Sequence, residues 1–195
     1  MTAPDGRVRC PWALAAPGYA DYLAYHDEEW GRPVRGERPL YERITLEAFQ
    51  SGLAWVTVLR KREAFRRAFA GFDPAVVAAY DETDVDRLLA DAGIIRNRRK
   101  IEAAIANARV VVGLSGGLTD LLWSFAPDQR RPAPRTPADV PAVTPESTAM
   151  ARALRAEGFR FVGPTTAYAL MQATGMVNDH LADCWCREAV GVLAR

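Results

Sequence analysis

Residues 88–101 read LLADAGIIRNRRKI, and this stretch decides how the rest of the chain is interpreted. Apolar residues at helical spacing run up to Gly93, a residue that commonly ends a helix and opens a turn. A second run of helical spacing starts near Asn97. The stretch therefore predicts two helices joined by a short turn, a helix-hairpin-helix element over about residues 83–108.

The turn of this hairpin favours contact with DNA. Backbone amides at a turn and at a helix start bind phosphate, and basic side chains beside them add charge. A second basic stretch, Arg60-Lys61-Arg62, is more typical of a solvated helix face. The predicted DNA-binding residues of the hairpin are Gly93, Ile95, Arg96, Arg98 and Lys100.

Helical patterns extend outward over most of the chain. Apolar residues at three-and-four spacing predict helices over residues 21–30, 39–51, 56–69, 83–91, 97–114, 120–125, 145–157 and 164–174. Thr83, with an acid at Asp86, is the expected start of the fourth helix. Only 159–162 is compatible with a short extended piece, and six prolines make 127–145 an irregular connection. We predict an all-α fold that forms a single compact unit over 1–195.

The composition sets limits on the location and on the partners. The chain has 195 residues, 49% of them hydrophobic, which is enough for one substantial core. A net charge of +1 excludes a globally basic nucleic-acid binder, although 25 Lys and Arg leave room for local basic patches. No run of roughly 20 apolar residues and no secretory signal pattern occurs, so we expect a cytoplasmic protein without a membrane span.

The cysteines and histidines suggest a metal site. Three cysteines are an odd and sparse set, which argues against a disulfide framework. Cys10 and His26 lie near the start of the chain, and His180 and Cys184 lie near its end. Two thiolates and two imidazoles fill a tetrahedral zinc shell, which would be structural and would join the segments around residues 10–26 and 180–184. Spacing alone also allows buried thiols and ordinary histidines.

Two details of this site stay open at the level of sequence. Cys186 is an alternative ligand to Cys184. Asp27 and Asp179 each follow or precede a histidine and are candidates to orient its ring, although a solvated acid is the commoner case.

Glu47 is the predicted catalytic residue. It shares one helical stripe with Leu40 and Ile44, and a carboxylate in a core position needs a hydrogen-bond or charge partner. A cationic ligand is one such partner, and an arginine or a helix N-terminus is the alternative. Aromatic residues are concentrated in the same part of the chain, as core or as a cage for a flat, positively charged base. The candidates are Trp12, Tyr22, Tyr25, Trp30 and Trp55.

Several motifs in order resemble those of the 3-methyladenine DNA glycosylase I family. They are YHDEEWG at 25–31, GLAWVTVL at 52–59, AGIIR at 92–96 and NDH at 178–180, together with Glu47. The resemblance extends from about Cys10 to Cys184, which is nearly the whole chain. It implies a helix-hairpin-helix glycosylase fold that acts on double-stranded DNA containing alkylated adenine.

The resemblance also implies roles for single residues. One structural zinc ion would be bound by Cys10, His26, His180 and Cys184. The base pocket would be formed by Trp12, Tyr22, Tyr25, Trp30, Glu47 and Trp55. Glu47 would contact the methylated adenine, and the Gly52-Leu53 turn would approach the gap left in the base stack.

The expected reaction is hydrolysis of the N-glycosidic bond by water without strand cleavage, carried out by a monomer. A lyase needs an amine nucleophile, and the only lysines, Lys61 and Lys100, lie in basic runs. Asp120 is an alternative base, but its position favours a role at a helix start. The main alternative function is a non-catalytic module that binds alkylation damage. A zinc hydrolase or deaminase would need an open position on the metal.

Overall fold

The computed structural model describes residues 2, 5–15, 20–128 and 131–190. These residues form helices, turns and loops without a named β-strand, and one isolated bridge joins Thr2 to Val8. The all-α prediction is confirmed. The α-helices are α1 Ala20–Glu28, α2 Glu37–Gln50, α3 Trp55–Ala68, α4 Pro74–Ala78, α5 Glu82–Ala90, α6 Arg98–Gly113, α7 Gly117–Trp123, α8 Pro145–Ala156, α9 Pro164–Ala173 and α10 Cys186–Ala189, with short 3-10 helices η1 Pro11–Leu14, η2 Ala70–Phe72 and η3 Pro137–Asp139.

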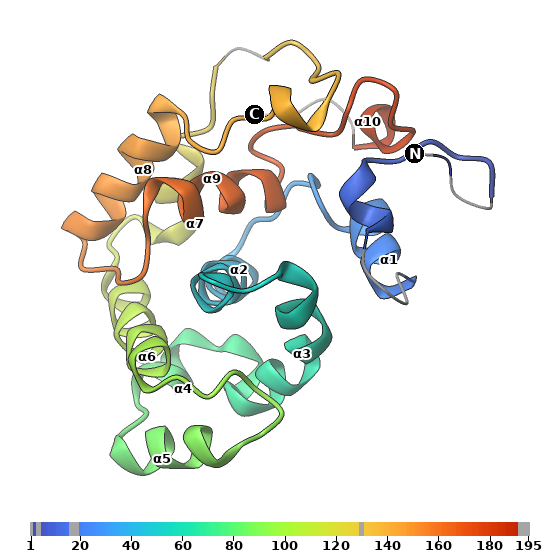
Figure 1. The fold of residues 1–195 in the computed structure, drawn as a ribbon. Coiled ribbons are helices and arrows are strands. Elements are labelled where there is room, and N and C mark those ends of the chain that lie inside the picture. Colours follow the sequence, from blue (N-terminus) through green and yellow to red (C-terminus); the bar gives the residue numbers. More distant parts are fainter. Residues whose placement is uncertain (1, 3–4, 16–19, 129–130, 191–195) are drawn as a thin grey trace.

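Helix α2 is the centre of the fold. Every residue from Leu40 to Phe49 is buried, and α3, α6, α7 and α9 all pack against this helix. In Figure 1, α3 to α6 lie below α2 and α7 to α9 lie above it. Polar side chains in the buried stretch of α2, including Glu47, are therefore surrounded by other helices rather than by solvent.

The eight predicted helices are all present, and each boundary agrees within three residues. Helix α5 begins earlier than expected because Asp81, not Thr83, is its N-cap and forms a capping box with Asp84. The short helices α4 and α10 were not predicted, since four or five residues give no periodicity to detect. Residues 159–162 form a turn between α8 and α9 rather than a strand.

The predicted hairpin is formed by α5, α6 and the turn between them. The Asp91 side chain accepts a hydrogen bond from the Gly93 amide at 2.7 Å, and Asn97 caps α6 by accepting from the Lys100 amide. A side chain at Gly93 would collide with Ala64 of α3, since its Cβ would lie 3.0 Å from that of Ala64. The turn therefore packs closely against α3.

The beginning and the end of the described chain lie side by side. The segment before η1 and helix α1, in blue, are next to α10 and the loop before it, in red (Figure 1). A backbone hydrogen bond of 3.0 Å joins the Trp185 amide to the Val8 carbonyl.

In the part of the chain that the structure describes, no single helix is long and apolar enough to span a membrane. Helices α6 and α7 meet that test only as a pair, and the pair is bent by 99°.

Candidate metal cluster and active site

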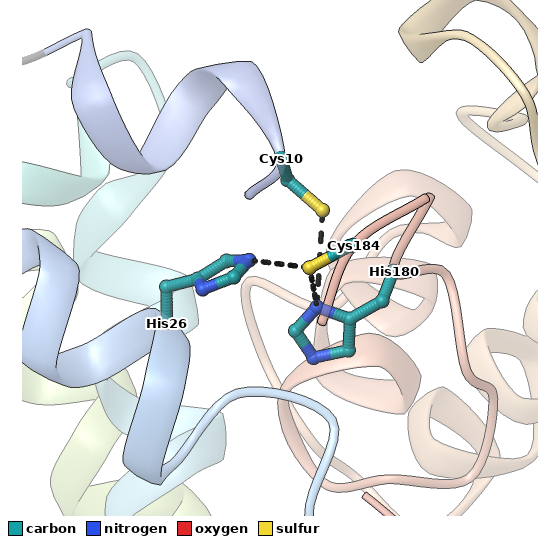
Figure 2. Close-up of side chains that lie close together, drawn as sticks. All are labelled: Cys10, His26, His180 and Cys184. Carbon is teal, nitrogen blue, oxygen red and sulfur yellow. Dashed lines mark hydrogen bonds between the residues drawn. The ribbon is translucent and has the colours of Figure 1, made fainter. Parts of the chain in front are cut away.

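Cys10, His26, His180 and Cys184 lie together and are all buried. Figure 2 shows Cys10 on the segment before η1, His26 on α1, and the other two on the loop before α10. The Cys184 sulfur is 3.6 Å from Nε2 of His26 and 3.5 Å from Nδ1 of His180, and the Cys10 sulfur is 3.8 Å from the same Nδ1. The structure thus brings together four side chains from the two ends of the chain.

The spacing of these atoms fits a tetrahedral metal ion. Bonds of about 2.3 Å to sulfur and about 2.0 Å to nitrogen, at the tetrahedral angle, place the two ligand atoms about 3.5 Å apart. The three sulfur-to-nitrogen distances of 3.5, 3.6 and 3.8 Å lie close to this value. The cluster could therefore hold a metal ion.

The outer nitrogen of each histidine ring has its own partner. Nδ1 of His26 is 2.8 Å from the Asp27 carboxylate, and Nε2 of His180 is 3.1 Å from the Trp30 carbonyl. These contacts direct the remaining nitrogens toward the thiols, as expected for metal-binding histidines. Asp27 thus contacts His26 as considered from the sequence, and Arg9 in turn pairs with the Asp27 carboxylate at 2.8 Å.

Cys186 lies on the opposite edge of the His26 ring. Its sulfur is 3.7 Å from Nδ1 of His26 and 3.5 Å from the Asp27 carboxylate, whereas Cys184 faces Nε2. Hydrogen bonds from Cys10 and Cys186 lower the pKa of the Cys184 thiol. The geometry therefore favours Cys184 as the metal ligand.

A cavity of about 280 Å³ lies beside the cluster, and Cys10 forms part of its wall. This volume is near the lower end of the range for ligand pockets, roughly 300 to 1,000 Å³, and suits a small ligand. The cavity wall includes all six side chains that the resemblance implies for a base pocket, namely Trp12, Tyr22, Tyr25, Trp30, Glu47 and Trp55.

The aromatic wall of the cavity is supported by the two histidines of the cluster. The ring of Trp12 is 5.1 Å from that of His26, and the ring of Trp30 is 4.6 Å from that of His180. Trp12 and Trp30 also meet edge to face at 5.1 Å. The two histidines therefore position two of the aromatic side chains that face the cavity.

Glu47 is buried without a hydrogen bond from any described residue. Its exposed fraction is 5%, and burial raises its pKa to about 8, while the charge of Arg43 one helical turn earlier acts in the opposite direction. Arg43 itself is paired with Glu29 at 2.8 Å, so the alternative of a Glu47–arginine pair is not realised. The indole N–H of Trp55 is likewise buried with no partner in the described chain. These groups can serve a polar, positively charged ligand.

Three polar residues of the cavity wall were not predicted: Gln50, Gln172 and Asp179. Gln50 is three residues after Glu47 on α2, and that spacing was a usable signal. Asp179 was considered as a partner of His180, but its carboxylate accepts from the Gln172 amide at 2.9 Å and from the Tyr168 hydroxyl. Its side chain lines the cavity because an irregular segment turns neighbouring residues in different directions.

The predicted DNA-binding residues fall into two groups. Gly52 and Leu53 form the exposed turn between α2 and α3, and the flanking Gln50 and Trp55 both line the cavity. Gly93, Ile95 and Arg96 belong to the turn of the hairpin, where Arg96 is exposed. The first group is thus at the rim of the cavity.

Two basic residues of the hairpin have partners within the protein, Arg98 at the surface and Lys100 in the interior. Arg98 is paired with Glu82 and with Asp86 at 2.8 Å. Lys100 is only 8% exposed and donates hydrogen bonds to the carbonyls of Phe49 and Ser51 at 2.8 and 2.7 Å. The direct DNA contact predicted for Lys100 does not fit this position, because its ammonium group faces the end of α2.

The other residues considered lie outside the cavity. Asp120 is exposed in the first turn of α7, which agrees with a role at a helix start rather than as a base in the cavity. In the second basic stretch, Arg60 pairs with Asp21, Arg62 pairs with Glu29, and Lys61 donates to the Ala92 carbonyl at 2.9 Å. These basic side chains therefore have partners within the protein and are not simply solvated.

Comparison with known proteins agrees with this geometry. A family model described as methyladenine glycosylase matches residues 12–188. The chain is 46% identical over 182 residues to DNA-3-methyladenine glycosylase 1 of Escherichia coli K12, covering 91% of this chain and 96% of that protein. A crystal structure of 3-methyladenine DNA glycosylase I superposes with a TM-score of 0.86 at 46% identity, covering 92% of this chain and 99% of that chain. A structure of the Staphylococcus aureus 3-methyladenine DNA glycosylase I, on 3-methyladenine recognition, superposes with a TM-score of 0.85 at 31% identity, covering 92% of this chain and 96% of that chain.

Proposed function

This chain belongs to the methyladenine glycosylase family, and on that premise we propose that its cavity binds 3-methyladenine turned out of DNA. The family membership makes it an enzyme, a glycosylase that breaks the bond between base and sugar. One observation carries the assignment of the site: the carboxyl group of Glu47, which has no hydrogen-bond partner among the described residues, lies buried among aromatic rings in a cavity. Such a site favours a flat cation over a neutral base.

The proposed recognition depends on the charge of the damaged base. Methylation at N3 places positive charge on adenine within the nucleotide and makes the base a good leaving group. The aromatic faces attract this cation, and Glu47 accepts a hydrogen bond from its amine. Normal adenine lacks the charge, so it gains less from the same groups.

The proposed reaction is hydrolysis. Water forms a bond to the sugar carbon and releases a proton to the solvent, the bond from that carbon to the base nitrogen breaks, and the free base leaves with the bonding electrons. Both lysines of the chain donate to backbone carbonyls and neither lines the cavity, which supports hydrolysis over a lyase reaction through an amine.

We further propose that Cys10, His26, His180 and Cys184 hold one zinc ion. Two sulfurs and two nitrogens with sulfur-to-nitrogen distances of 3.5 to 3.8 Å are the donor set that zinc prefers. Four protein ligands leave no position for water, so the ion would supply a structural link between the two ends of the chain.

For the DNA, we propose that Leu53 enters the space left by the extruded nucleotide. Its side chain is 42% exposed at the rim of the cavity, which is unusual for a large apolar residue. The α5–α6 hairpin, with Gly93, Ile95, Arg96 and Arg98, would contact the DNA backbone. A monomer acting in the cytoplasm stays a prediction from the sequence.

The test is release of free base from methylated duplex DNA, resolved by chromatography. We expect the wild type to release 3-methyladenine and Glu47→Gln to release it at least tenfold more slowly, since about 1.4 kcal/mol of transition-state stabilisation gives that factor. Glu42→Gln is the matched control, because Glu42 lies on the same helix and pairs with Arg66 outside the cavity. Binding of methylated DNA without any release by the wild type would instead establish a non-catalytic damage-binding module.

A further inference from the structure

The turn that carries Leu53 has little support of its own. It comprises residues 51–54, all of them exposed, and Gly52 adopts a φ of +84°. Its backbone hydrogen bonds are local: the Ser51 amide donates to the Ala48 carbonyl at 3.4 Å, and the Leu53 amide donates to the Gln50 carbonyl at 2.6 Å. A side chain that enters a stack of bases is opposed by the free energy needed to unstack them. The turn therefore needs anchors elsewhere in the protein.

Lys100 anchors the α2 side of this turn. Its ammonium group donates to the Phe49 and Ser51 carbonyls, which are left without partners where α2 ends. A cation at the C-terminal end of a helix also interacts favourably with the helix dipole. Lys100 lies at the start of α6, so this contact joins the hairpin to the turn across about fifty residues of sequence.

Lys61 anchors the α3 side. Its ammonium group donates to the carbonyls of Ala92 and Gly93 in the hairpin turn at 2.9 and 3.2 Å. The close approach of Gly93 to Ala64 places the same turn directly on α3. The helices on both sides of residues 51–54 are therefore tied to the hairpin, each by one lysine.

We propose that Lys100 and Lys61 are positioning residues for base extrusion. They fix the 51–54 turn to the hairpin, so that Leu53 keeps its position when the protein binds duplex DNA. This proposal rests on the function proposed above. It predicts that the lysines matter for damaged bases in duplex DNA, where a base must be unstacked. They should matter much less for a base already free of the stack.

The experiment compares Lys100→Met, which keeps the apolar stem and removes the ammonium group, with the wild type in three assays. These are binding of free 3-methyladenine, excision from a methylated single strand and excision from a methylated duplex. We expect base binding to stay within about twofold and duplex kcat/KM to fall at least tenfold, with a much smaller loss on the single strand. Leu53→Ala should show the same pattern, and adding Lys100→Met to it should cost little more.

Arg109→Met is the matched control. Arg109 also lies on α6 and donates to the carbonyls of Ala78 and Tyr80 near the end of α4, which is unrelated to the 51–54 turn. It should leave the ratio of duplex to single-strand excision unchanged. Lys61→Met, on the other anchor, should lower that ratio as Lys100→Met does, and it serves as the test if Lys100→Met does not fold.

Several results would overturn the proposal. Unchanged duplex excision in both lysine variants would do so, as would equal losses in all three assays. A direct phosphate contact by Lys100 would reduce the slope of log affinity against log salt by about 0.9 in the Met variant, whereas an internal anchor leaves the slope unchanged. Absence of base release by the wild type would instead contradict the proposed function.

Discussion

At Glu47, burial and neighbouring charge act in opposite directions. Burial raises the pKa of the carboxyl group to about 8, and Arg43 lowers it. Arg43 and Arg62 share the single carboxylate of Glu29, so this group of three has a net charge of +1. An ionised Glu47 would balance that charge from one turn further along α2. Binding of a cation in the cavity should therefore favour ionisation of the Glu47 carboxyl group.

The pH dependence of excision should follow the ionisation of Glu47. We expect kcat/KM on methylated DNA to rise with pH with a midpoint near 8, because the ionised carboxylate pairs with the cationic base. Glu47→Gln should give a low and flat profile, and Arg43→Met should move the midpoint upward. Glu42→Gln should keep the wild-type profile. A flat wild-type profile between pH 6 and 9 would show that this carboxyl group does not titrate in the reaction.

The same pKa predicts how stability depends on pH. Between its ordinary pKa of 4.5 and about 8, Glu47 holds its proton in the folded state and loses it on unfolding. Its contribution to the free energy of unfolding therefore falls as pH rises through this range. Urea unfolding without ligand should find Glu47→Gln equal to wild type near pH 4 and more stable than wild type at pH 8, by on the order of 4 kcal/mol. If Glu47→Gln and the wild type were equally stable at both pH values, the pKa of Glu47 would not be raised by burial in the folded state.

The first 55 positions hold an acid on a core stripe and a concentration of aromatic rings, and the family resemblance implied which six of these residues form the cavity wall. It could not indicate Gln172 and Asp179, which reach the cavity from the other end of the chain. Local spacing carries no information about such a distant approach. Only the packing of α9 against α2 brings these residues to the site.

At the level of helices, local signals decided where elements begin and end. Asp81 and Thr144 are side-chain caps, and Pro164 takes the first position of α9. The charges of the hairpin were harder to interpret, because a helical pattern shows which residues share a face and not what opposes that face. Both Arg98 and Lys100 lie in the first turn of α6, but their partners differ. Arg98 pairs with carboxylates at the surface, whereas Lys100 donates to backbone carbonyls at the end of α2.

Asn107 links α6 to the turn between α8 and α9. Its buried amide accepts from the Arg160 amide at 2.7 Å and donates to the Arg160 carbonyl at 3.2 Å. The next residue, Phe161, has a φ of +56°, which an L-residue adopts only when its surroundings hold it there. Asn107→Ala should therefore lower the free energy of unfolding by about 2 kcal/mol in urea titrations.

The cap residue Asn97 provides the comparison for this prediction. Asn97→Ala removes one hydrogen bond at an exposed helix start and should cost about 1 kcal/mol. If Asn107→Ala were no more destabilising than Asn97→Ala, the 159–163 turn would be held by other contacts.

At the scale of the whole molecule, the cluster of Cys10, His26, His180 and Cys184, which is proposed to hold zinc, and the cavity form one unit. His26 and His180 contact Trp12 and Trp30, so loss of the metal should loosen the aromatic wall. We expect Cys184→Ala to lose its bound zinc, to lower Tm by about 10 °C and to weaken binding of free 3-methyladenine at least tenfold. Metal content, thermal unfolding and tryptophan fluorescence titration measure these effects.

Cys186→Ser is the control for the cluster, since Cys186 lies outside the four-residue set. It should retain one zinc ion per chain and bind the base as the wild type does. If Cys184→Ala lost its metal but kept full affinity for the base, the cluster would have no part in shaping the cavity. Spacing in the sequence could not show that residues 10 and 184 meet; the family resemblance implied it, and their positions in the structure agree.

The cluster also imposes an order on how the protein is made. Cys10 and His26 leave the ribosome before their partners, which are about 170 and 154 residues further along the chain. At 5 to 20 residues per second, the interval is on the order of 10 to 30 s. During that time the first two ligands have no native partners, and the aromatic wall that they support is incomplete.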